Sequence, residues 1–113
     1  MSAFSLGDFE TDLSEVTATG YSTAFRPKGT EVVCFQTIST GVTTGATIKI
    51  QGSQLESPTA ATATHWYDLA TISADADESH SAVVDEPHRW LRANITAYTD
   101  GTHSVVHRNG ERR

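Results

Sequence analysis

The clearest pattern of apolar and polar positions lies in the segment from His88 to Tyr98. Apolar residues occupy every second position of it: Leu91, Ala93, Ile95 and Ala97. The positions between them are polar: Arg92, Asn94 and Thr96. Successive side chains of a β-strand point to opposite faces of its sheet. The segment is therefore predicted to be a half-buried strand whose apolar side faces the core.

Six further segments are predicted to be strands from their composition or alternation: 13–25, 31–39, 46–51, 66–72, 80–85 and 102–108. In segment 46–51, Ile48 and Ile50 alternate with polar residues. Segment 31–39 instead carries an unbroken apolar run, Val32 to Phe35, which favours a central strand covered on both faces. Cys34, in this run, is predicted to be a small buried hydrophobic residue.

The spacing of these segments predicts the fold class. Short strands recur about every ten residues, turn residues separate them, and helical periodicity is nearly absent. We therefore expect an all-β protein, a jelly-roll-like antiparallel β-sandwich of about seven to eight short strands. The 113 residues suit one domain. The predicted division is an N-terminal arm at 1–12, a sandwich at 13–108 and a C-terminal tail at 109–113.

The predicted arm carries three large apolar residues, Phe4, Leu6 and Phe9, among Ser, Gly and Asp. No helical face forms there. We expect the arm to dock either on its own domain or on a neighbouring molecule, with these three residues as partner-binding anchors.

Charge narrows the class of partner. The net charge is −6 and only two residues are lysine, whereas a nucleic-acid-binding protein needs a basic face. No apolar run is long enough to span a membrane, and the first residues lack the pattern of a secretory signal. We therefore expect neither nucleic acid nor membrane as a partner, and no export through the usual secretory route.

The residues that could carry chemistry form no recognisable site. His103 and His107 would share a strand face about 13 Å apart, too far to bind one ion, whereas His80 and His88 could meet across a turn. The acidic segment 75–78 lacks the central glycine and the closing glutamate of a calcium loop. We expect no metal, no cofactor, no catalytic residue and no enzymatic activity.

The aromatic residues Trp66, Tyr67 and Trp90 leave two interpretations open. They could seal the core or a subunit interface, or they could form an exposed platform for sugars. If Leu91 faces the core, Trp90 points outward, and we therefore expect Trp90 to be an intersubunit anchor. Arg92 lies on the same polar face and is added to the predicted partner-binding residues.

Three segments, taken in order, resemble small β-sandwich virion proteins of tailed phages and archaeal tailed viruses. They are Thr47-Ile-Lys-Ile-Gln-Gly-Ser53, His65-Trp-Tyr-Asp-Leu69 and Pro87-His-Arg-Trp-Leu-Arg-Ala-Asn-Ile-Thr96. This chain departs from that pattern between Leu55 and Thr64, where its loop is longer and rich in Ala and Thr.

The resemblance implies a capsid decoration (cement) protein on the virion surface, made in the host cytoplasm. Its implied partners are the major capsid protein or other virion proteins, together with copies of itself, with a trimer as the expected oligomer. Two alternatives stay open: a tail or neck completion protein of the same fold, and a carbohydrate-binding module or receptor-facing spike.

Overall fold

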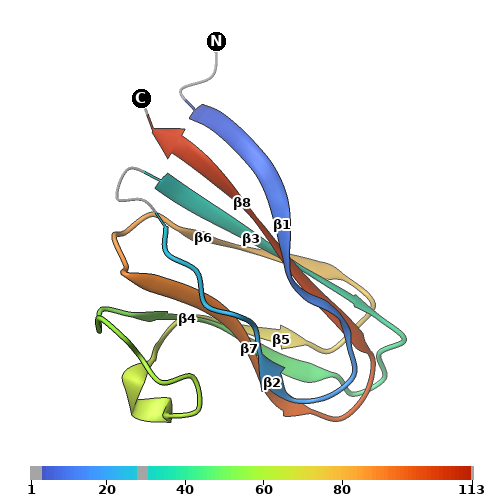
Figure 1. Ribbon diagram of the computed structural model, residues 1–113. Helices are drawn as coiled ribbons and strands as arrows, with labels where there is room; N and C mark the ends of the chain where they lie inside the picture. Colours follow the sequence, from blue (N-terminus) through green and yellow to red (C-terminus); the bar gives the residue numbers. More distant parts are fainter. Residues whose placement is uncertain (1–3, 28–30, 113) are drawn as a thin grey trace.

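The computed structural model describes residues 4–27 and 31–112 and shows eight β-strands in two facing sheets (Figure 1). The strands are β1 (Phe4–Val16), β2 (Gly20–Tyr21), β3 (Glu31–Thr40), β4 (Ala46–Ser53), β5 (Tyr67–Ala74), β6 (Ser79–Val84), β7 (Trp90–Tyr98) and β8 (Thr102–Arg112). A 3-10 turn, η1 (Ala63–His65), is the one helical element among the described residues.

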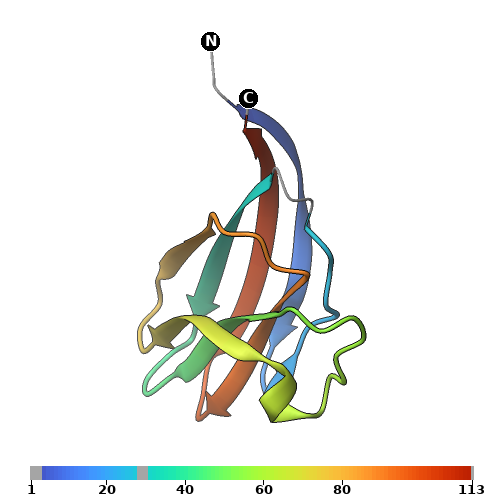
Figure 2. The same cartoon turned by 90° about the vertical axis from the view of Figure 1, so that its left-hand side faces the viewer.

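The strand order confirms the predicted sandwich and gives it the topology of a jelly roll. One sheet has the order β1-β8-β3-β6 and the other β2-β7-β4-β5. The four antiparallel pairs β1–β8, β2–β7, β3–β6 and β4–β5 are nested, as if one long hairpin had been wound into two layers. Figure 2 shows the two layers from the side, with the β4–β5 loop lying at the second sheet.

The core lies between the sheets and consists mainly of aliphatic side chains. Its buried residues are Leu13, Val33, Phe35, Ile48, Ile50, Ile72, Ala74, Val84, Leu91, Ala93, Ile95 and Val105. Leu91, Ala93 and Ile95 therefore face inward, as their alternation predicts. Ala97 is exposed, contrary to prediction. A β-bulge between Ile95 and Ala97 on β7 inserts one residue and turns the following side chains over.

Residues 4–12 of the predicted arm and residues 109–112 of the predicted tail belong to strands of the sheet, β1 and β8. β1 begins at Phe4 and pairs with β8, from Phe4 opposite Arg112 to Val16 opposite His103. The start of β1 and the end of β8 lie side by side at one end of the sandwich (Figure 1). The strand was not predicted for two reasons. The segment is rich in Ser, Gly and Asp, and three register shifts in its pairing with β8 interrupt the alternation of apolar and polar residues.

Strand β3 is central in its sheet but is covered on one face only. Its alternate residues Val33, Phe35, Thr37 and Ser39 are buried in the sandwich. Cys34, Gln36 and Ile38, between them, are exposed on the outer face. The predictions that β3 is covered on both faces and that Cys34 is buried are therefore wrong for the isolated chain. The run is apolar on both sides, yet the described residues supply a cover for one side.

Candidate functional site

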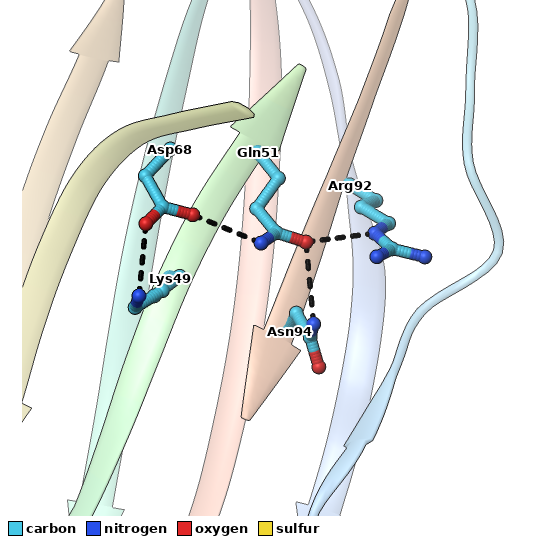
Figure 3. Close-up of polar contacts among 5 residues, drawn as sticks. All are labelled: Lys49, Gln51, Asp68, Arg92 and Asn94. Atoms are coloured by element: carbon cyan, nitrogen blue, oxygen red, sulfur yellow. Dashed lines mark hydrogen bonds and ion pairs between the residues drawn. The ribbon is translucent and has the colours of Figure 1, made fainter. Parts of the chain in front are cut away.

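A polar row crosses the outer face of the β2-β7-β4-β5 sheet. Gln51 on β4 lies opposite Asp68 on β5 and opposite Arg92 on β7. Its amide nitrogen donates to Asp68 at 2.9 Å, and its amide oxygen accepts from Arg92 Nε at 2.9 Å and from Asn94 at 3.2 Å (Figure 3). The row is continuous because the three strands carry polar residues at matching register positions.

The acidic end of this row is an exposed ion pair. Lys49 Nζ donates to Asp68 Oδ2 at 2.8 Å. The pKa of the Asp68 carboxyl lies below its ordinary value because Gln51 donates a hydrogen bond to it and Lys49 donates another. The carboxylate is thus satisfied by two donors on β4.

Arg92, at the other end, is buried, with 3% of its surface exposed. Its guanidinium carbon lies 4.0 Å from the centre of the Trp66 ring and 4.7 Å from that of the Tyr21 ring. Its Nη1 donates to the carbonyl oxygen of Ala60 at 2.7 Å. Burial lowers the pKa of Arg92, while the Tyr21 phenol acts in the opposite direction. Arg92, predicted to bind a partner, thus contacts Tyr21, Trp66 and Ala60 of its own chain.

These contacts hold the long β4–β5 loop against the sheet. Trp66 Nε1 donates to Thr59 O at 3.2 Å, and Trp90 Nε1 donates to Glu56 O at 3.3 Å. Trp66 is 8% exposed, and Arg26 lies over the half-buried Trp90 ring at 5.5 Å. Trp66 is therefore covered and cannot form the exposed platform considered from the sequence.

Tyr67, the third aromatic residue of that platform, is 37% exposed, and its hydroxyl lies 2.6 Å from His88 Nδ1. Burial and the charge of Glu86 raise the pKa of Tyr67, while a hydrogen bond with Gln54 opposes them. Its phenol is thus anchored to the segment that precedes β7.

A pocket of about 300 Å³ opens beside Arg92, between β2 with the residues that follow it and the β4–β5 loop. Its lining residues are Tyr21, Ser22, Thr23, Ala24, Ala60, Trp66 and Arg92. Tyr21 is 46% exposed, whereas Ser22 is buried and its hydroxyl accepts a hydrogen bond from the backbone N–H of Ala93. No pattern in the sequence indicates this pocket, because Tyr21 and Arg92 are far apart along the chain.

The outer face of the β1-β8-β3-β6 sheet has a different character. An open apolar groove runs along it, lined by Phe9, Val32, Cys34, Gln36, Ile38, Val83, Val106, His107, Arg108 and Gly110. Phe9 is 59%, Val83 61% and Ile38 40% exposed. We call these residues the outer apolar face. Phe9 was predicted from the sequence to bind a partner, whereas Cys34, Ile38 and Val83 were not. The apolar run of β3, which continues on both faces of the strand, is the feature of the sequence that indicates this surface.

The five predicted partner-binding residues therefore do not form one site. Phe9 belongs to the outer apolar face, whereas Trp90 and Arg92 lie on the opposite sheet. Phe4 and Leu6 belong to β1, and their side chains lie outside the described part of the structure.

The histidines are used within the fold. His103 Nδ1 lies 2.9 Å from Ser39 Oγ, and buried His107 lies 2.7 Å from Asp12 and stacks on Phe25. His80 contacts Glu78. His80 and His88, which could have met across a turn, thus have different partners. Within residues 4–27 and 31–112, no three His, Cys, Asp or Glu side chains are grouped to hold a metal.

None of the described residues belongs to a helix that is long and apolar enough to cross a membrane. No family model matches the sequence, and no curated protein matches it. One solved structure, described as "Bacillus endospore appendages form a novel family of disulfide-linked pili", is similar with a TM-score of 0.45 and 11% identity. The match covers 98% of this chain and 90% of that one. A likeness at this level of similarity says nothing about function. The described residues form an eight-stranded jelly roll.

Proposed function

We propose that this protein is a virion structural subunit, a capsid decoration protein that works by assembling with copies of itself rather than by catalysis. The observation that carries the proposal is the outer apolar face. Strand β3 has the composition of a strand covered on both faces, and residues 4–27 and 31–112 cover one of them. A second copy of the chain supplies the missing cover.

The outer face of the whole sheet, of which the outer apolar face is a part, has about the area that such an interface needs. Ten-residue β3 is roughly 33 Å long, and four strands about 4.8 Å apart span roughly 19 Å. One copy would therefore contribute roughly 600 Å², and two copies about 1,200 Å², the lower bound for stable protein interfaces. Packing two sheets face to face is also the ordinary way in which sheets bury apolar surface.

The composition of the face favours a protein partner. Its exposed side chains include Phe9, Ile38 and Val83, and exposed apolar patches of this kind mark interaction sites. A second copy meets the same face by two-fold symmetry, which is the commonest arrangement of identical subunits and is proposed here in place of the trimer that the resemblance implies. The net charge of −6 would keep the remaining surface of the assembly polar.

The virion part of the proposal is supported by the resemblance of three segments to tailed-virus proteins and by the jelly-roll topology, which viral capsid domains share with lectins. This support is by analogy of fold and sequence pattern. The predicted docking of Phe4, Leu6 and Phe9 on a neighbouring virion protein belongs to the same proposal, as does the predicted role of Trp90 as an intersubunit anchor.

Self-association is tested with Val83→Glu, which places a carboxylate on the outer apolar face, on the edge strand β6. The control is Leu55→Glu, since Leu55 is 46% exposed but lies in the β4–β5 loop. Light scattering during size-exclusion chromatography should give a multiple of 12.2 kDa for the wild type and for Leu55→Glu, and a monomer for Val83→Glu. A wild type that is monomeric throughout a concentration series would refute assembly through this face.

The virion role is tested separately, by cryo-electron microscopy of particles with and without this protein. Density for the jelly roll outside the capsid shell is expected, and density at the neck or tail would favour a completion protein instead. If particles produced with the gene intact contain no copy of the protein, a virion role is contradicted, whatever the oligomeric state of the protein.

A further inference from the structure

Arg92 is a buried cation without a balancing anion in the described part of the chain. Its hydrogen-bond acceptors, the side-chain oxygen of Gln51 and the carbonyl oxygen of Ala60, are both neutral. None of the ion pairs among residues 4–27 and 31–112 includes it. The carboxylate in the same row, Asp68, lies beyond Gln51 and is bound to Lys49 (Figure 3). Buried charges in proteins are ordinarily paired.

The guanidinium also has donors to spare. It carries five N–H groups, of which two are used by Gln51 and Ala60. The other three have no hydrogen-bond partner among the described residues, and Arg92 lines the 300 Å³ pocket. The guanidinium packs on the rings of both Tyr21 and Trp66 and is hydrogen-bonded to Gln51 and Ala60, which restrict its orientation before any ligand arrives.

We propose that this pocket binds a small ligand with a single carboxylate and a hydroxylated ring, such as a sugar acid. A guanidinium matches a carboxylate with two parallel hydrogen bonds. One cation balances one carboxylate, whereas a phosphate of about −1.5 to −2 would leave excess charge on a protein of −6. The half-exposed Tyr21 ring can stack against a sugar, and Ser22 and Thr23 place hydroxyls beside it.

The size of the pocket sets the size of the ligand. A volume of about 300 Å³ is at the lower end of the range for small-molecule sites, which suits one monosaccharide. The pocket lies on the sheet opposite the outer apolar face. The inference therefore stands independently of self-association. Of the aromatic residues considered from the sequence as a sugar platform, the pocket includes Trp66 and neither Tyr67 nor Trp90.

The test is a titration of the ¹⁵N-labelled protein, followed by NMR, with three probes. Methyl glucuronide carries both ring and carboxylate, methyl glucoside carries the ring alone, and acetate carries the carboxylate alone. We expect saturable shifts at Tyr21, Thr23 and Arg92 Nε with methyl glucuronide, at an affinity about tenfold or more above that of either other probe. Equal affinities for glucuronide and glucoside, or no saturable shift, would overturn the proposal and leave Arg92 as a residue that holds the loop.

A pair of variants at Thr23 tests the pocket while Arg92 itself is left in place. Thr23 is exposed and lines the pocket, so Thr23→Glu supplies a competing carboxylate, and Thr23→Gln has the same shape without the charge. We expect Thr23→Glu to weaken methyl glucuronide binding about tenfold or more and Thr23→Gln to change it less than about threefold. Equal affinities in the two variants would show that the carboxylate is bound elsewhere.

Discussion

Replacing Leu91 with alanine tests the arrangement of the two sheets. Leu91 is fully buried on β7, opposite Gly52 of β4, and its backbone exchanges two hydrogen bonds with Phe25, at 2.9 and 3.0 Å. Alanine keeps those backbone bonds and removes only core contacts. Such truncations cost about 2–5 kcal/mol, as lost transfer free energy plus the cavity left behind. We expect a loss of about 3 kcal/mol in the free energy of unfolding.

The loss is large enough to be measured in two ways. With a urea m-value of roughly 1.5 kcal/mol/M, 3 kcal/mol moves the unfolding midpoint by about 2 M. At about 2.1 cal/mol/K per residue, the 113 residues give an unfolding entropy near 0.24 kcal/mol/K, and Tm falls by about 13 °C. Both experiments need one fixed protein concentration, because self-association shifts the apparent stability.

Leu55→Ala is the matched control for this substitution. The same atoms are removed there, but Leu55 is 46% exposed, and the expected change is within about 0.5 kcal/mol. A loss below about 0.5 kcal/mol for Leu91→Ala, or equal losses for the two variants, would show that β7 presents its other face to the core.

Two further predictions concern the turns. Asp100 accepts hydrogen bonds from the backbone N–H groups of Thr44, Thr43 and Gly45, which lower its pKa. A lowered folded-state pKa gives stability that is present above the unfolded pKa of about 3.9 and is lost as the pH falls through the folded pKa. Asp100→Asn should therefore be less stable than the wild type at pH 7, and urea titrations should show that deficit narrowing below about pH 4; a constant deficit would contradict this. Gly45→Ala should cost at least about 2 kcal/mol, since φ is +105° and the new Cβ would lie 2.0 Å from the Ala74 carbonyl oxygen. Gly41→Ala, at φ +66° in open space, should lower the free energy of unfolding by only about 1 kcal/mol. Thermal unfolding of both variants measures the two losses, and equal losses would refute the steric argument.

Alternation predicted the parts of the fold in which local sequence and tertiary environment agree. Leu91, Ala93 and Ile95 face inward because the core is one layer of side chains between two sheets. The error at Ala97 comes from a β-bulge, which depends on pairing with β4 and leaves no local mark. The length of β1 was missed for the same reason, since its pairing with β8 joins the two ends of the chain.

The environment of Arg92 could not be predicted from its neighbours in the sequence. Its rings and acceptors come from β2, from β4 and from the β4–β5 loop, and all of these contacts are long-range. An arginine on the polar face of a strand is ordinarily exposed. The Ala-rich β4–β5 loop that covers it supplies two of these contacts, from Ala60 and Trp66.

The error at β3 is the most informative one for function. The run Val32 to Phe35 predicts cover on both faces, and the structure buries Val33 and Phe35 but exposes Cys34. The residue types of a strand suit the contacts that it makes in the assembled protein, whereas the structure of a single chain shows only the contacts within that chain. The proposed second copy reconciles the pattern with the structure.

The thiol of Cys34 measures that central claim directly, because it is the single cysteine and lies within the outer apolar face. Its rate of reaction with a chromogenic disulfide reagent should fall as the wild-type concentration rises through the range of self-association. The rate in monomeric Val83→Glu should stay high at every concentration. A wild-type rate that is high and independent of concentration, equal to that of Val83→Glu, would contradict burial of this face by a second copy.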